Sequence, residues 1–127
     1  MLAGTYNMLA EQGSTLYRVI SLEYPDSTDP SGETYLKWDL DGYTARMQVR
    51  RLIEDTNFMI EITTENGGID VEPSGEAGRI DLTMTAVQTA ALDSDGVYDL
   101  EIIDTGATGT VSKVIKGTFT LIPEVTR

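Results

Sequence analysis

The 127-residue sequence contains no cysteine and no histidine. Without cysteine the chain can form no disulfide, no thiol nucleophile and no thiolate metal site, so stability has to come from packing or from neighbouring subunits. Without histidine it lacks the commonest general base and the commonest zinc ligand. Most hydrolytic mechanisms need one of these two side chains. We therefore predict a protein that is not an enzyme and holds no cofactor or metal.

Basic residues are scarce, since Lys and Arg number 9 against 21 Asp and Glu, for a formal net charge of −12. Such a charge repels phosphate backbones and anionic lipid surfaces. The sequence also has no run of about 18 apolar residues and begins without a basic segment followed by an apolar core. We therefore expect no nucleic-acid partner, no membrane span and no signal peptide, and a protein made in a cytoplasm.

Long helical patterns are missing too, and the chain instead has short runs of β-branched and aromatic residues between turn residues. In "TARMQVRR" (44–51), Ala45, Met47 and Val49 alternate with polar residues, as in a strand with one buried face. Similar alternation recurs in "FMIEIT", "GRIDLTMT" and "GVYDLEII". The pattern predicts an all-β fold, an antiparallel immunoglobulin-like β-sandwich of about seven or eight strands in a single domain over residues 1–127.

Turn residues divide these strands. Gly13 and the segment "TGATGT" (105–110) predict turns, and Asn66-Gly67 predicts a tight hairpin because both residues tolerate positive φ. Gly117 is expected to break the last strand into two. The acidic segment 24–33, rich in Ser and Pro, is expected to be an exposed loop.

Two local patterns are more specific. Thr85 and Gln88 have the spacing of a capping box and predict one short helix. In "DSDGVYDL", Tyr98 follows an acidic turn and precedes Leu100 by two residues, which is the spacing of the tyrosine corner of immunoglobulin-like domains. We therefore expect Tyr98 to close a corner and Leu100 to lie in the core.

The segment "DLDG" (39–42) resembles part of a calcium loop. With Gly42 at the sixth position, Asp39 and Asp41 occupy the third and fifth, but Lys37 and Gln48 stand where the first and last carboxylate ligands are required. We therefore interpret the segment as a turn that leads into a strand.

Two further acidic groups, 93–95 and the acids of segment 24–33, could hold a hard cation only if the fold brought them together. Solvated loop charge is the favoured interpretation.

Four aromatic residues fall within 20 positions, and three of them, Tyr35, Trp38 and Tyr43, are candidates for stacking on sugar rings. We expect Trp38 to be buried against the core and Tyr43 to lie at a strand start. If the three instead line one exposed face, a carbohydrate-binding β-sandwich module becomes the alternative function.

Several segments, taken in order along nearly the whole chain, resemble small virion proteins of tailed bacteriophages. They are "AGTYNM", "QGST", "DLDGYTARMQVR", "RIDLTMTAVQTAAL", "GVYDLEII" and "GTFTLIPEVTR". Such proteins occur among tail, baseplate and fibre genes, notably in phages of cyanobacteria and other aquatic bacteria, and are similar in pattern to the immunoglobulin-like N-terminal domain of upper-baseplate proteins. The sequence departs from the pattern in "YPDSTDPSGETYLKW", which is longer and more acidic, and in "DLDGY", where "DLTGY" is usual.

The resemblance implies a structural protein without catalytic residues, assembled in the host bacterial cytoplasm and located in the virion. Its partners would be other tail, baseplate or fibre subunits and copies of itself, joined through sheet edges or termini. A capsid decoration or cement protein is the alternative within this class.

The densest basic cluster, Arg46, Arg50 and Arg51, is the first candidate for a partner contact on so acidic a chain. The competing interpretation is ordinary cross-strand pairing with Glu and Asp. At the C-terminus, Pro123 ends the last strand, and the tail to Arg127 could extend onto a partner.

Overall fold

The computed structural model describes residues 3–106 and 108–127, and in this part the chain is mostly β with one short α-helix. The all-β prediction is thus confirmed. The elements are β1 (Gly4–Thr5), β2 (Met8–Glu11), β3 (Leu16–Ser21), β4 (Glu23–Pro25), β5 (Tyr35–Lys37), β6 (Tyr43–Arg50), β7 (Ile60–Thr63), β8 (Ile69–Val71), the 3-10 helix η1 (Pro73–Gly75), β9 (Arg79–Met84), α1 (Ala86–Ala90), β10 (Gly96–Asp104) and β11 (Val111–Ile122). The eleven strands exceed the predicted number because the N-terminal edge is split in two and the region of the acidic loop adds the β4–β5 pair.

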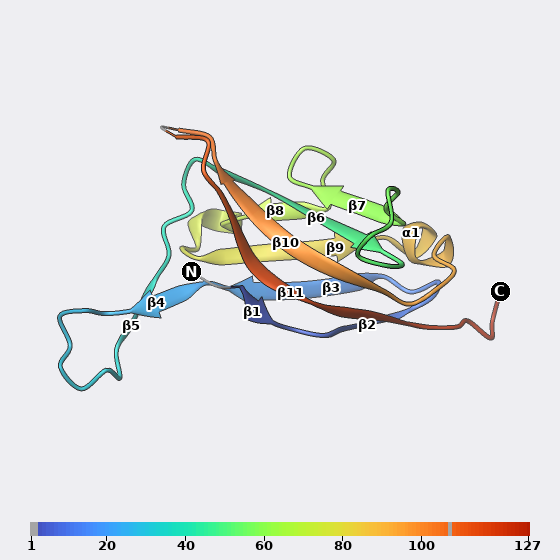
Figure 1. Cartoon of the computed structure of the whole chain (residues 1–127), viewed down its shortest axis with the longest axis horizontal. Helices are drawn as coiled ribbons and strands as arrows, with labels where there is room; N and C mark the ends of the chain where they lie inside the picture. The colour runs from blue at the N-terminus through green and yellow to red at the C-terminus, as the bar shows by residue number, and fades with distance from the viewer. Residues whose placement is uncertain (1–2, 107) are drawn as a thin grey trace.

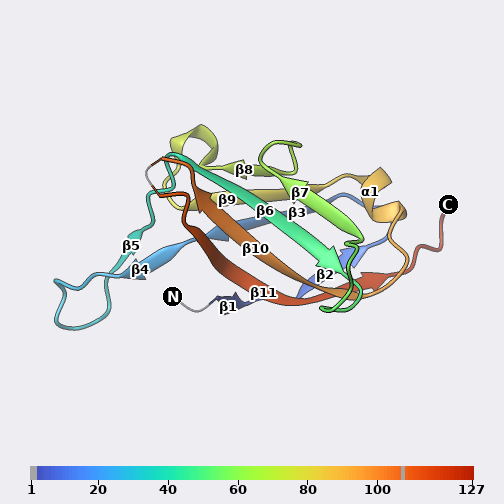
Figure 2. The same cartoon turned by 45° about the horizontal axis from the view of Figure 1, so that its top comes forward.

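The strands form two larger sheets, which lie as two layers in Figure 1 and Figure 2. One has six strands in the order β1-β11-β10-β6-β7, with β2 also paired to β11, and the other has the order β3-β9-β8. The two-stranded β4–β5 hairpin lies apart from both. Residues 1, 2 and 107 lie outside the described part. Residue 107 falls within the turn predicted at 105–110, and the antiparallel pairing of β10 with β11 on either side of this segment agrees with that prediction.

The core lies between the two layers. Ala45, Met47 and Val49 of β6 belong to one cluster of buried side chains with Ile80 and Leu82 of β9. The cluster is completed by Met8, Ala10, Leu16, Leu22, Leu40, Ile62, Ile69, Met84, Leu92, Tyr98, Leu100, Ile102, Val114, Ile115 and Phe119. The alternation in the sequence therefore predicted the buried faces of β6, β9 and β10 correctly.

The strands differ from the prediction in three respects: their direction, one connection and the length of β11. The sheets are not antiparallel throughout, because β1 and β2 both run parallel to β11. Asn66-Gly67 does not close a hairpin, since it joins β7 of one sheet to β8 of the other. Gly117 does not break β11, which runs unbroken from Val111 to Ile122. Local sequence thus indicates where turns and strands lie, whereas contacts between distant segments decide which strands pair and how far each strand runs.

Tyr98 and Leu100 are both buried in β10, but Tyr98 does not close the predicted corner. Its hydroxyl donates to the carbonyl of Tyr6, far away in the sequence, and not to a residue just upstream. Burial raises the pKa of the Tyr98 hydroxyl, so it stays a protonated donor. Tyr98 therefore fastens the N-terminal segment to the six-stranded sheet.

The predicted helix is confirmed as α1, and both hydrogen bonds of its capping box are present. The backbone N–H of Gln88 donates to Thr85 Oγ1 over 3.1 Å, and the Thr85 N–H donates to Gln88 Oε1 over 2.8 Å. In the described part of the chain, no helix has the length and hydropathy needed to cross a bilayer.

Candidate functional site

Residues 23–37, which we call the arm, form a β-hairpin that projects beyond the ends of both large sheets (Figure 1). Strands β4 and β5 pair with Tyr24 opposite Leu36, and the Asp26 N–H continues the ladder to the carbonyl of Thr34 over 2.8 Å. An exposed ion pair joins Lys37 to Glu23 over 2.6 Å. The segment predicted to be an exposed acidic loop is therefore exposed, but its flanks are ordered as a hairpin.

The tip of the arm is held by two aspartates. Asp26 Oδ1 accepts from both the N–H and the hydroxyl of Thr28, over 2.9 and 2.6 Å. Asp29 accepts from the N–H and hydroxyl of Ser31 and, with its second oxygen, from the Thr34 N–H over 2.9 Å. Because hydrogen bonds favour the ionised carboxylate, the pKa of Asp26 is lowered and that of Asp29 falls to about 2. The arm tip is thus both charged and stiffened.

The pKa of Asp29 gives a direct test of this geometry. A carboxyl whose folded pKa lies below its ordinary value of 3.8 stabilises the tip above about pH 4, and this contribution is lost as the pH falls towards 2. We expect the Asp29 carboxyl carbon to titrate near pH 2 by NMR, together with the Thr34 amide. In the Asp29→Asn variant that amide step should be absent, and a midpoint near 4 in the natural protein would contradict the hydrogen bonds.

The base of the arm is anchored in the body. The Leu22 N–H donates to the Gly78 carbonyl over 2.8 Å, and the Trp38 N–H donates to the Leu22 carbonyl over 3.0 Å. Leu22 is buried, and Trp38 packs against the core. The N–H of the buried Leu40 donates to Glu72 Oε2 over 2.8 Å. The arm therefore leaves the body in a fixed direction.

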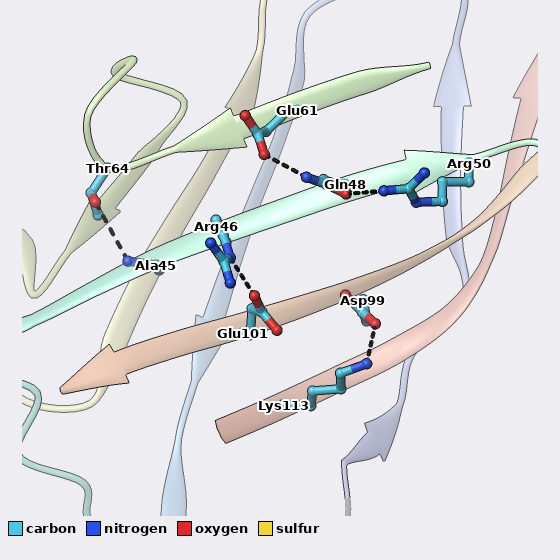
Figure 3. A network of polar contacts seen from close by, with 9 residues as sticks. All are labelled: Ala45, Arg46, Gln48, Arg50, Glu61, Thr64, Asp99, Glu101 and Lys113. Carbon is cyan, nitrogen blue, oxygen red and sulfur yellow. Dashed lines mark hydrogen bonds and ion pairs between the residues drawn. The ribbon is translucent and has the colours of Figure 1, made fainter. Parts of the chain in front are cut away.

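The outer face of the six-stranded sheet carries a groove of about 1070 Å³. We call this surface the groove, and its lining comes from β6, β10, β11 and the N-terminal edge. It is lined by Ala3, Thr5, Asn7, Arg46, Gln48, Arg50, Ile53, Val97, Tyr98, Asp99, Glu101, Lys113, Lys116, Gly117 and Thr118. The side chains alternate in charge from strand to strand, and Figure 3 shows the resulting network.

The predicted arginine cluster does not act as a unit. Arg46 pairs across strands with Glu101, which raises the pKa of Arg46. Arg50 donates to the carbonyls of Asp55 and Thr56, each over 2.8 Å, and so holds the loop that follows β6. Arg51 lies off the groove, with its nearest acid, Asp93, at 4.0 Å. Cross-strand pairing, which Figure 3 shows, thus accounts for Arg46, and support of the loop accounts for Arg50.

Two groove lysines were missed by the sequence analysis. Lys113 pairs with Asp99 over 2.9 Å, which raises the pKa of Lys113. Lys116 is exposed, lies opposite Asp99 and beside Thr5 in the sheet register, and makes no ion pair within residues 3–106 and 108–127. The strand pairings that gather these lysines with Arg46 cannot be seen in the sequence, where they stand far apart.

Charge is unevenly distributed over the molecule. Four cations and two acids line the groove, for a net charge of +2. The rest of the chain then holds five cations and 19 acids, a net charge of −14. The groove is therefore a basic island on an acidic protein.

The C-terminal candidates lie at the end of the molecule away from the arm (Figure 1). Pro123 follows β11 directly, as predicted for a strand breaker. The next residue, Glu124, donates its N–H to Gln12 Oε1 over 3.0 Å, whereas Val125 and Arg127 are exposed. The tail beyond Glu124 is thus exposed and open to contact.

The three candidate stacking aromatics differ in exposure. Trp38 and Tyr43 are half-buried and pack against the core, whereas Tyr35 stands exposed on the arm. Of the three, only Tyr35 presents a largely open ring to a sugar.

The acidic segments do not assemble into a cation site. The arm and residues 93–95, which follow α1, lie at opposite ends of the molecule (Figure 1). Asp39 and Asp41 form a turn in which the Asp41 N–H donates to Asp39 Oδ1 over 3.0 Å, and Gly42 has a φ of 82°. Among the residues that the structure describes, no three His, Cys, Asp or Glu side chains are grouped so that they could hold a metal ion.

No family model matches the sequence, and no curated protein shows significant similarity to it.

Proposed function

We propose that the protein is a non-enzymatic structural subunit of a tailed-bacteriophage virion, in the tail, baseplate or fibre-attachment region, and that it acts through protein–protein contacts. The observation that carries the proposal is a stiff, exposed arm on the same rigid β scaffold as a charged groove. The order of motifs along nearly the whole chain, which resembles virion proteins, supports the location. Its partners would be neighbouring virion subunits and copies of itself.

The fold that we propose for this subunit is an immunoglobulin-like sandwich. The order β3-β9-β8 corresponds to strands B, E and D of that fold, and β7-β6-β10-β11 corresponds to C′, C, F and G. The first strand would then be displaced from its place beside B to the edge of the other sheet, where β1 and β2 run parallel to β11. In this arrangement the arm is an insertion between B and C.

The electrostatics of four acids suit a structural role and not general acid catalysis. Asp26, Asp29, Glu65 and Asp81 all have pKa values lowered by hydrogen bonds, from Thr28, Thr34, Thr64 and Arg79 respectively. A catalytic acid needs the opposite shift, produced by an apolar pocket. These carboxylates serve as fixed negative charges and hydrogen-bond acceptors.

Mass spectrometry of purified virions tests the proposal. We expect the protein in intact particles and in tails separated from capsids. Retention with tail-free capsids would instead favour a decoration or cement protein. Absence from particles, or robust turnover of polysaccharide or peptide by the purified protein, would refute the proposed function. A glycan array with the natural protein and the Tyr35→Ala variant tests the carbohydrate-binding alternative, because Tyr35 has the open ring.

A further inference from the structure

The arm and the groove carry opposite charge. Four acids and one lysine give the arm a net charge of −3, against +2 for the groove. The acids of the arm are Glu23, Asp26, Asp29 and Glu33. Complementary potentials of this kind steer association and fix the orientation of partners.

Exposed apolar side chains accompany the charges on both surfaces. The arm presents Tyr24, Tyr35 and Leu36. The groove presents Ile53, which is 83% exposed on the loop after β6, with Val97 of β10 also in the lining. Tyrosine is enriched among residues that dominate binding energy, and Ile53 offers the groove an exposed apolar side chain for such a contact. Each surface thus has an apolar anchor, and two charged side chains that make no ion pair within the described residues, Glu33 on the arm and Lys116 in the groove, are opposite in sign.

The arm cannot reach the groove of its own chain. It projects away from the sheets in both Figure 1 and Figure 2, and its base is fixed by the backbone bonds of Leu22 and Trp38. The arm is long enough to enter a groove on another molecule. At about 3.3 Å per residue, the paired stretch from Glu23 to Asp26 reaches about 10 Å and the turn closed by the Asp29 N–H on the Asp26 carbonyl adds less than about 7 Å, whereas the groove runs about 17 Å along β11 from Lys113 to Thr118.

We propose that the arm of one copy of this chain occupies the groove of a second copy. The inference deepens the proposed function and rests on it for the place of the assembly in a virion. With one arm and one groove on each copy, the contact can be made twice in a two-fold dimer that exchanges arms, or it can repeat from copy to copy into a ring or filament. The fixed base and the hydrogen-bonded tip reduce the entropy lost when the arm is bound.

Two double variants, each changed at exposed positions, test the arm and the groove separately. In the arm variant, Glu33→Lys reverses a charge and Tyr35→Ser removes an anchor; in the groove variant, Lys116→Glu and Ile53→Ser do the same. Sedimentation velocity should show concentration-dependent association of the natural protein. Each variant alone should associate at least about tenfold more weakly, as expected for loss of an aromatic anchor and a charge contact.

Mixing the two variants gives the decisive result. The groove variant keeps its arm and the arm variant keeps its groove, so a mixture should form a 1:1 dimer that does not grow further. A matched control, Arg51→Glu with Val87→Ser, alters an exposed charge and an exposed apolar residue outside both surfaces and should associate like the natural protein. Circular dichroism melts should show that all three variants are folded.

Four outcomes would overturn the inference. These are a natural protein that stays monomeric at every accessible concentration, an arm or groove variant that associates normally, a mixture that remains monomeric, and a control that loses association. The proposed function is judged separately, by the presence of the protein in virions. A monomeric protein found in particles would refute only the arm–groove contact, whereas a self-associating protein absent from particles would refute only the virion role.

Discussion

Replacing Phe119 by alanine is expected to lower the free energy of unfolding by about 3–5 kcal/mol, the usual cost of removing a fully buried phenylalanine. The Phe119 side chain has 0% exposure and lies in β11, where its backbone is paired with Gly96 of β10 and Met8 of β2. The cavity would therefore open where three strands meet. Since a domain of this size has about 5–15 kcal/mol of stability in total, the variant should be close to unfolding at elevated temperature.

The chain offers a matched control, because its only other phenylalanine, Phe58, is 45% exposed in the loop before β7. Phe58→Ala removes the same atoms from a half-open site and should cost about 1 kcal/mol or less. Urea unfolding followed by circular dichroism gives both values. Equal losses for the two variants would mean that Phe119 is not part of the core.

The sequence indicated well which side chains are buried, but it gave little information about which strands pair with one another. Alternation is a local property, so Met47, Leu82 and Leu100 could be assigned to the core without knowing their neighbours. Pairing is decided by contacts between distant segments. Asn66-Gly67 has the composition of a hairpin turn, yet it connects two sheets, because the buried side chains of β7 and β8 pack in opposite layers.

The sequence predicted only part of the candidate site, and the reason is again that strand pairing is not visible in it. Arg46, Arg50 and Arg51 attracted attention because they are close in sequence, but two of them are engaged with Glu101 and with backbone carbonyls. Lys116 is isolated in the sequence, and only the β10–β11 and β1–β11 registers place it on the groove surface. Closeness in the sequence therefore pointed to Arg46 and Arg50, which do line the groove, but gave no sign of Lys116.

The arm is formed by a long acidic segment that lies outside the core. The residues of "YPDSTDPSGETYLKW" form most of the projecting hairpin and part of its base. Ordering a segment that adds no buried side chain to the core costs conformational entropy, so the presence of an ordered arm needs another explanation. A contact outside the molecule supplies one, since the tip is ordered by Asp26 and Asp29 and not by packing.

The second large effect is expected at Gly117, where alanine should destabilise the N-terminal edge and the groove together. Glycine in a strand interior often marks the close approach of another backbone. A Cβ at this position would collide with the Tyr6 carbonyl oxygen and lie 2.8 Å from Asn7 Oδ1. To relieve the collision, the segment between β1 and β2 must move away from β11.

That movement would break three hydrogen bonds that hold the edge. Tyr6 donates its N–H to the Lys116 carbonyl over 2.9 Å and accepts from the Tyr98 hydroxyl, and the Thr118 N–H donates to Asn7 Oδ1 over 3.1 Å. Overpacking and these losses should together cost about 1–3 kcal/mol, with faster amide hydrogen exchange confined mainly to β1, β2 and the facing part of β11.

Gly4→Ala is the matched control, because it adds the same methyl group to the same edge, where the nearest atom, the Val114 carbonyl oxygen, is 3.8 Å away. It should change stability by no more than about 0.5 kcal/mol and leave exchange unaltered. Thr5, Asn7 and Gly117 line the groove, so Gly117→Ala should also weaken self-association without changing any charge. If exchange in β1 and β2 stayed slow in that variant, the glycine would not be required by the crossing of Tyr6, and the N-terminal edge would have to be held to β11 in some other way.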